Sequence, residues 1–257
     1  IQLFTRSGAR LISLQMNQQR RPELQDIRVR QAIVHAINNK GIASKIMRGF
    51  ATPAGQQSPP GYQGHLASLA PRYDLALAQK LMQQAGYGSG FRLSMIAPNN
   101  RYVNDAKIAQ AVVIMLAKIN IKVDLVTMPK AQYWKKYDQA SSDLMMLGWH
   151  SDTEDSANFS EMLAMCRNAD SGDGRDSGGH YCNPEVDRLV SASAKQTNLK
   201  KRTQMLQQVE QILYQDAAFV PLHWQHLAWG ARKGINIKDV LTVMNIPYLA
   251  DLVVAQP

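Results

Sequence analysis

The stretch from residue 91 to residue 128 reads FRLSMIAPNNRYVNDAKIAQAVVIMLAKINIKVDLVTM. Its two ends, residues 91–98 and 121–128, are short runs of apolar and β-branched residues that predict strands. Between them, apolar residues recur at helical spacing over 104–119. A strand, a crossover helix and a second strand form the repeating unit of a parallel sheet, so this stretch predicts an α/β fold.

The same alternation continues on both sides of this unit. Asp74 is a predicted N-cap of a helix that ends at Gly86. Residues 131–140 predict another helix, and SDLMMLGW at 142–149 predicts another strand. From residue 74 to residue 149, helices and strands therefore alternate, which indicates a largely parallel sheet covered by helices.

The remaining segments give shorter or more distant elements. We expect a helix capped by Asp26, a short helix at 39–48 and a long loop over 49–73. A loop of this length in a compact domain is usually functional or connects lobes. The other expected elements are strands at 9–16 and 219–229 and helices at 184–195 and 199–215.

Composition limits the class of protein. The chain has 257 residues, of which 45% are apolar and 19% charged, as in globular domains. It has no run of 18 apolar residues, so we expect no membrane-spanning helix. The net charge of +9 is spread along the chain, so we expect no nucleic-acid partner. Ile1 is followed by no signal-peptide pattern, and we expect further sequence upstream.

Cys166 and Cys182 flank a loop that is rich in Gly, Asp and Ser. Such a loop has few apolar residues to hold it in place. A disulfide would stabilise it by about 3 kcal/mol in the chain-entropy model, and would require an oxidising compartment. The residues alone also allow two unrelated buried thiols.

Motifs for catalysis and metal binding are weak. GYGSGF at 86–91 precedes a strand and lacks the dinucleotide-binding spacing, and 170–176 lacks the acids of a calcium loop. His223 and His226 are three apart in a predicted strand, which places them on opposite faces. We therefore expect no catalytic residue, no metal and no cofactor. An enzyme that uses paired acids for proton transfer is the alternative.

Two segments at predicted strand ends carry candidate binding residues. In open α/β sheets, ligands bind beyond the carboxyl ends of the strands. Trp149 and Asp152 follow the strand 142–149, where Trp149 can form a pocket wall and Asp152 can bind a cation. The alternative is that Trp149 is a core residue and Asp152 caps a helix that starts near residue 155.

Arg101 lies just beyond the carboxyl end of the strand 91–98 and can hold an anion through two parallel hydrogen bonds. If both strands belong to one sheet, Arg101 and Asp152 lie at the same edge. One anion binder and one cation binder suit a zwitterion such as an amino acid or a peptide.

Several segments together resemble one protein family. They are PELQDIRVRQAIVHAINNKGI at 22–42, YDLALAQKLMQQAGY at 73–87, GWHSD at 148–152, NPEVDRLV at 183–190 and RTQMLQQVEQILYQDAAFVPLHW at 202–224. In this order they resemble the family 5 periplasmic solute-binding proteins, which are dipeptide and oligopeptide receptors of ABC importers. The resemblance covers essentially the whole chain.

The resemblance implies an α/β fold of a particular kind: the C-terminal lobe of a two-lobed (class II, cluster C) binding protein, with a mixed sheet flanked by helices. Residues 16–225 would form this second lobe. Residues 1–15 would lead from an N-terminal lobe near the hinge, and residues 226–257 would return across the hinge.

The resemblance also assigns residue roles. Asp152 would take the α-ammonium group of a peptide, and Arg101 the α-carboxylate. Gly148, Trp149, His150 and Ser151 belong to the matched motif and would contact the ligand. The Cys166–Cys182 pair matches a cysteine pair of dipeptide-binding members, which implies a disulfide.

The implied function is a monomeric periplasmic receptor that binds short peptides and delivers them to a membrane permease. Two other possibilities stay open. One is the ligand-sensing domain of a transcriptional regulator, and the other is a receptor of the same family for a nickel chelate, haem or an oligosaccharide.

Overall fold

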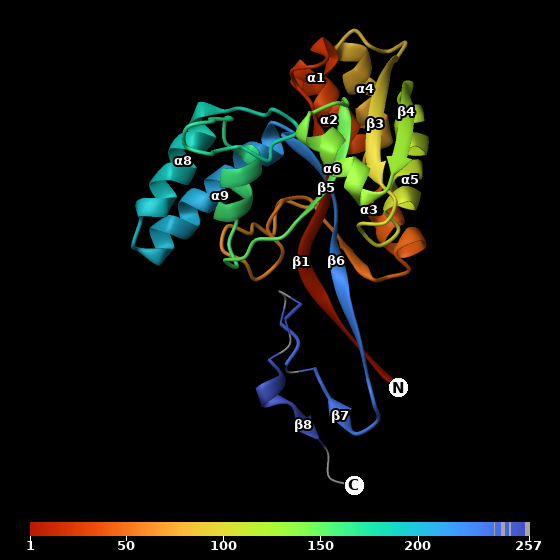
Figure 1. The fold of residues 1–257 in the computed structure, drawn as a ribbon. Helices are drawn as coiled ribbons and strands as arrows, with labels where there is room; N and C mark the ends of the chain where they lie inside the picture. Colours follow the sequence, from red (N-terminus) through yellow and green to blue (C-terminus); the bar gives the residue numbers. More distant parts are fainter. Residues whose placement is uncertain (239, 243–244, 247, 255–257) are drawn as a thin grey trace.

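The computed structural model describes residues 1–238, 240–242, 245–246 and 248–254 (Figure 1). Its main sheet has six strands in the order β2-β6-β1-β5-β3-β4. The strands are β1 (Gln2–Met16), β2 (Ala51–Pro53), β3 (Phe91–Pro98), β4 (Ile121–Met128), β5 (Leu144–Trp149) and β6 (Phe219–Ala231).

The sheet is mixed. Strand β3 pairs in parallel with both β4 and β5, as the alternation from residue 74 to residue 149 predicts. Strands β1, β2 and β6 come from outside that stretch and pair antiparallel. The prediction of a mixed sheet flanked by helices is therefore confirmed, and its parallel part is limited to three strands.

The α-helices are α1 (Pro22–Gln25), α2 (Ile27–Ala36), α3 (Asn39–Gly41), α4 (Leu75–Gln84), α5 (Asp105–Ala117), α6 (Lys130–Asp138), α7 (Ala157–Phe159), α8 (Pro184–Lys195) and α9 (Leu199–Gln215). Two of the predicted caps are confirmed, since Asp26 accepts a hydrogen bond from Arg28 N at 2.8 Å and Asp74 accepts one from Leu77 N at 3.0 Å. The predicted helix at 39–48 is α3 followed by a π-helical turn, η1 (Ile42–Ile46).

Each face of the sheet carries its own apolar core. Helices α2, α4 and α5 cover one face, and α6, α7, α8 and α9 pack on the other. Because successive side chains of a strand point to opposite faces, Ile12 and Leu14 of β1 enter the first core and Leu11 enters the second. Figure 1 shows α8 and α9 set apart from the group of α1, α2, α4 and α5.

Strands β1 and β6 are longer than predicted. Their outer halves pair from Gln2↔Ala231 to Ser7↔His226 and form a two-stranded arm that projects from the lobe (Figure 1). A short sheet of β7 (Ile235–Asn236) and β8 (Val253–Val254) lies beside this arm, with a 3-10 turn, η3 (Leu249–Asp251), between its strands. The expected hinge role of residues 1–15 and 226–257 stays a prediction, and residues 239, 243–244, 247 and 255–257 lie outside the described chain.

A disulfide joins Cys166 and Cys182, which confirms the predicted pair and excludes two separate thiols. It closes the polar loop between η2 (Ser160–Ala164) and α8. In the described part of the chain, no helix has both the length and the apolar character needed to cross a membrane.

Candidate functional site

The candidate site lies at the carboxyl edge of β3 and β5. These strands are parallel neighbours, with Met95 opposite Leu144 and Ile96 opposite Met145. The segments that follow them, which carry Arg101 and Asp152, therefore leave the sheet at the same edge. This is the arrangement that the sequence predicted on the condition that both strands share one sheet.

Tyr102 connects the two segments. Its Oη accepts a hydrogen bond from Gly148 N at 2.8 Å. A Cβ atom at position 148 would lie 2.5 Å from Tyr102 Cε1, so the close approach of the ring requires glycine there. The carboxylate of Asp105, buried at the start of α5, accepts hydrogen bonds from the backbone N–H groups of Arg101 at 2.8 Å and Tyr102 at 3.0 Å. The backbone that carries Arg101 is thereby held on α5 and against β5.

The Arg101 side chain is exposed at this edge. Its guanidinium carbon lies 5.1 Å from the centroid of the Tyr102 ring, within the range of a cation–π contact. Among the described residues, the guanidinium forms no ion pair and no hydrogen bond. Its five N–H donors are therefore available to a ligand.

The Asp152 side chain is exposed, with 73% of its surface accessible. Its Oδ1 lies 3.2 Å from His150 Nε2. Burial lowers the pKa of His150, the charges of Arg10 and Arg101 lower it further, and only Asp152 opposes them. The imidazole is therefore neutral at pH 7.

Asp152 makes no recorded contact with the start of α7 in the described chain, whereas Asp155 does, so the alternative role of Asp152 as a helix cap is wrong. Asp155 Oδ1 accepts hydrogen bonds from Ala157 N and Thr153 Oγ1, both at 2.9 Å. Its Oδ2 forms an ion pair with Arg202 Nη2 of α9 at 2.7 Å, and the Asp155 side chain is only 8% exposed. Asp155 therefore fixes the loop after β5 to α9.

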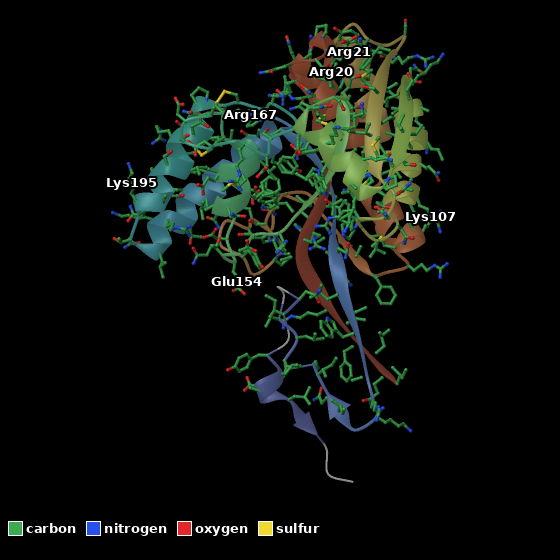
Figure 2. The ribbon with its side chains drawn as sticks, viewed as in Figure 1. Arg20, Arg21, Lys107, Glu154, Arg167 and Lys195 are labelled. Atoms are coloured by element: carbon green, nitrogen blue, oxygen red, sulfur yellow. A yellow bond between two sulfur atoms is a disulfide. The ribbon has the colours of Figure 1, made fainter. Side chains whose placement is uncertain are left out.

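The sequence predicted a loop over 49–73, but Ala51–Pro53 form strand β2, so the loop is limited to residues 54–74. This loop forms a second side of the site. Gln63 N donates to Glu154 O at 3.1 Å, and Ser156 N donates to Gln63 O at 3.1 Å. Glu154 itself has a positive φ of 51° and projects from the edge of the lobe on the side of the β1–β6 arm (Figure 2). The long loop predicted from the sequence is thus placed beside the segment of Asp152.

Trp149 is both a core residue and part of the wall of a hollow, the two roles that the sequence left open. Its indole packs against the second core, and its Nε1 donates to Asn158 Oδ1 at 2.9 Å. Trp149 also lines a small hollow of about 10 Å³. Ser151, Tyr62 and Pro59 also line this hollow, so Ser151 and Trp149 lie together next to Asp152.

Arg10 belongs to the same edge, and the sequence analysis missed it. Strand β1 pairs antiparallel with β5, and the last recorded pair is Leu11 opposite Trp149. One further step of this register places Arg10 opposite His150. In agreement, the charge of Arg10 lowers the pKa of His150, and the charge of Arg101 lowers the pKa of Arg10 after the larger effect of burial.

A β-bulge sets the position of Arg10. Ser7 pairs with His226, and Leu11 pairs with Trp224. Strand β1 has three residues between these two pairs, whereas β6 has only Gln225. A bulge bends a strand and re-aims its side chains. Gly8 is required here, because a Cβ atom would lie 2.4 Å from Gln225 O. Gly8, two residues before the charged Arg10 at the start of an apolar run, was the available sequence signal.

The described residues contain no group of three or more His, Cys, Asp or Glu side chains that could hold a metal. His223 is fully buried, and burial lowers its pKa to about 4. His226 contacts Thr52 Oγ1 through Nε2 at 2.8 Å. The two histidines do not form a shared site.

The fold and this edge agree with a family of binding proteins. The family model described as bacterial extracellular solute-binding proteins, family 5 Middle, matches residues 1–171, and the chain belongs to this family. Members of the family are solute-binding proteins rather than enzymes.

Individual relatives refine this picture. The chain is 27% identical over 228 residues to heme-binding protein A of Haemophilus influenzae, covering 86% of the chain and 40% of the relative. It is 26% identical over 223 residues to the dipeptide-binding protein of Escherichia coli K12, covering 84% and 41%. The chain thus spans about 40% of the length of these curated relatives.

Solved structures show the same fold. The periplasmic binding protein DppA of Helicobacter pylori, in complex with the peptide STSA, matches with a TM-score of 0.81 and 26% identity over 95% of this chain and 47% of that one. HbpA2 of Haemophilus parasuis matches with a TM-score of 0.87 and 21% identity over 99% and 50%.

Proposed function

We propose that the protein containing this chain is the periplasmic substrate-binding component of an ABC importer and binds short peptides. The observation that carries the proposal is the placement of Arg101 and Asp152 at one sheet edge, beyond the carboxyl ends of β3 and β5. Each side chain is exposed there. Dipeptide-binding proteins among the relatives support the choice of peptide over other solutes.

In this proposal the two charged ends of a peptide select the ligand. Asp152 binds the α-ammonium group, and the neutral imidazole of His150 orients its carboxylate. Arg101 binds the α-carboxylate through its free N–H groups, and Tyr102 holds it in place. Gly148, Ser151 and Trp149 lie on the segment between these ends and contact the backbone of the ligand.

The domain roles are part of the same proposal. Residues 16–225 form one ligand-binding lobe, and the segments 1–15 and 226–257 connect it across a hinge to a second lobe. Closure of two lobes around a ligand is a known mode of hinge motion. Closure removes the charges from water, so each charged group of the ligand needs a partner in the cleft.

The proposed compartment and partner follow from the family and the disulfide. The family is described as extracellular, and the Cys166–Cys182 bond requires an oxidising environment. The protein acts as a monomer and delivers its ligand to a membrane permease. A haem-binding protein is also among the relatives. Paired anion and cation binders favour a zwitterion over a neutral solute such as an oligosaccharide.

Isothermal titration calorimetry of the full-length protein tests the proposal. The ligands are Ala-Ala, N-acetyl-Ala-Ala and Ala-Ala-amide. We expect binding of the free dipeptide and a loss of at least about tenfold in affinity when either end is blocked, because a charged group of the cleft then loses its hydrogen-bond partner. Equal affinities for all three would contradict the assignment of Asp152 and Arg101, and no binding of any peptide would contradict the function.

A further inference from the structure

The site carries more positive charge than a simple zwitterion needs. Arg101 and Asp152 are sufficient for the two ends of a dipeptide. Arg10 adds a second guanidinium to the same edge, while His150 is neutral at pH 7 because its pKa is lowered. The described residues thus place two guanidinium groups, those of Arg10 and Arg101, beside Asp152 in the proposed binding space.

The Arg10 side chain has no partner among the residues that the structure describes. In the described chain its side chain forms no ion pair with a carboxylate within 4.0 Å and no hydrogen bond. For comparison, Arg20 pairs with Asp143 at 3.2 Å, and Arg202 pairs with Asp155 at 2.7 Å. Arg10 is also only partly exposed, between the buried residues Ala9 and Leu11 of β1. A partly buried guanidinium without a partner is costly, and more so in a closed cleft.

The fold directs Arg10 toward the ligand side of the sheet edge. Ile12 and Leu14 share one face of β1, and Ile12 lies opposite Gly148 of β5. Tyr102 packs over Gly148 on this same face, since a Cβ atom at 148 would meet both Tyr102 and Ile12. Arg10 follows the bulge two residues before Ile12 and lies near Tyr102 and Arg101, because its charge acts on both side chains. Arg101 lies over the Tyr102 ring at the open edge.

We propose that Arg10 forms a second anion site beside Arg101, and that the preferred ligands are peptides with an acidic side chain. Arg101 binds the α-carboxylate, Arg10 binds the carboxylate of an Asp or Glu side chain, and Asp152 binds the α-ammonium. The ligand then carries two negative groups and one positive group, which complement the two guanidiniums and one carboxylate of the site. This inference rests on the proposed peptide-binding function.

Calorimetry with matched dipeptides tests it on the full-length protein. Ala-Glu is compared with Ala-Gln, and Glu-Ala with Gln-Ala, because each pair differs only in the charge of one side chain. We expect at least one acidic peptide to bind about tenfold or more tightly than its amide partner, the range of a charged hydrogen bond. In R10Q this ratio falls to about one, while Ala-Gln binds as in the wild type.

Three further variants control the experiment. R10K keeps the charge and retains most of the acidic preference. R101Q weakens all peptides, acidic and neutral. K80Q removes one exposed charge on α4 and leaves every affinity unchanged. Thermal unfolding of each variant checks that it is folded, and if R10Q does not fold, the wild-type ratios and R10K still decide the result.

The outcomes separate this inference from the proposed function. If no peptide binds, the proposed function is wrong and the inference falls with it. If peptides bind but the acidic ones gain nothing over their amides, the inference alone is wrong. If R10Q weakens neutral and acidic peptides equally, Arg10 shares the α-carboxylate with Arg101, and the second anion site is also overturned.

Discussion

Tyr102 and Gly148 contact each other across the edge where the two candidate ligand-binding segments meet, with Tyr102 Oη accepting a hydrogen bond from Gly148 N at 2.8 Å. The ring that makes this contact also supports the Arg101 guanidinium. The contact therefore couples the end of β5, which carries the proposed ammonium binder, to the loop that carries the proposed carboxylate binder.

Gly148→Ala should disturb this contact. The new Cβ would lie 2.5 Å from Tyr102 Cε1 and 2.8 Å from Ile12 Cδ1, so the ring must move. We expect a loss of about 1–3 kcal/mol in the free energy of unfolding, as for overpacked cores, and weaker peptide binding through Arg101. Urea unfolding and calorimetry measure the two effects. Gly230→Ala is the control, because its Cβ would meet only Ile1 at 3.4 Å, and an equal loss there would contradict the packing argument.

Asp152→Asn should weaken binding of peptides with a free α-ammonium by about tenfold or more, because a charged hydrogen bond contributes about 1.5–3 kcal/mol. Glu154→Gln is the matched control. Glu154 lies two residues further along and projects from the edge of the lobe (Figure 2), so its loss should leave affinity unchanged. Calorimetry with Ala-Ala compares the variants, and equal effects of both would show only a general role of negative charge.

Arg202→Met should destabilise the fold strongly. It leaves the carboxylate of Asp155, which is 8% exposed, without its cation. Removing one partner of a buried ion pair costs about 3–5 kcal/mol in the free energy of unfolding. Arg188→Met breaks an exposed pair with Glu185 and should have little effect on the free energy of unfolding, because water screens the pair. Denaturant unfolding at pH 7 distinguishes them, and a small effect of Arg202→Met would mean that Thr153 and the backbone suffice to hold Asp155.

Glu210 should make stability depend on pH. This carboxyl is fully buried and accepts hydrogen bonds from Ser58 N at 3.0 Å and Gln57 N at 3.3 Å. Burial raises its pKa from 4.5 to about 7. The folded state therefore holds a proton that the unfolded state has lost between these values, so stability falls as pH rises from about 4.5 to 7, by about 3 kcal/mol.

Glu210→Gln isolates this contribution. The variant has no carboxyl at this position, so the difference in unfolding free energy between wild type and variant should change in that pH window and stay constant above it. Urea unfolding at several pH values measures it. A constant difference from pH 4.5 to pH 7 would mean that the pKa of Glu210 is not raised.

The local elements of this protein were predictable from its sequence. Strands β3 and β4 and helices α8 and α9 begin and end at the predicted residues. Their boundaries depend on nearby residues, such as the Asn198 side chain that accepts a hydrogen bond from Lys201 N at 3.1 Å at the start of α9. Strand β1 was predicted from residue 9 onward, because its outer half is held by pairing with β6 and not by an apolar periodicity.

The residues of the candidate site were also predictable only where they depend on local sequence. Arg101 and Asp152 could be placed at one edge from the sequence, because parallel neighbouring strands end on the same side of a sheet. Arg10 could not, because its position depends on the antiparallel register between β1 and β5 and on a bulge opposite Gln225. Register between distant segments is set by the packing of both cores, which no local pattern encodes.

The sequence by itself thus determined most of the helices and strands of the lobe, the cysteine pair, the family resemblance and two charged residues at strand ends. Only the tertiary structure decided that Ala51–Pro53 form strand β2, that Asp155, and not Asp152, accepts the hydrogen bond from Ala157 N at the start of α7, and that Arg10 joins Arg101 and His150. The physical reason is that hydrophobic periodicity reports which face of an element is buried. Which charged side chains lie close together depends on which elements become neighbours and in what register they pair.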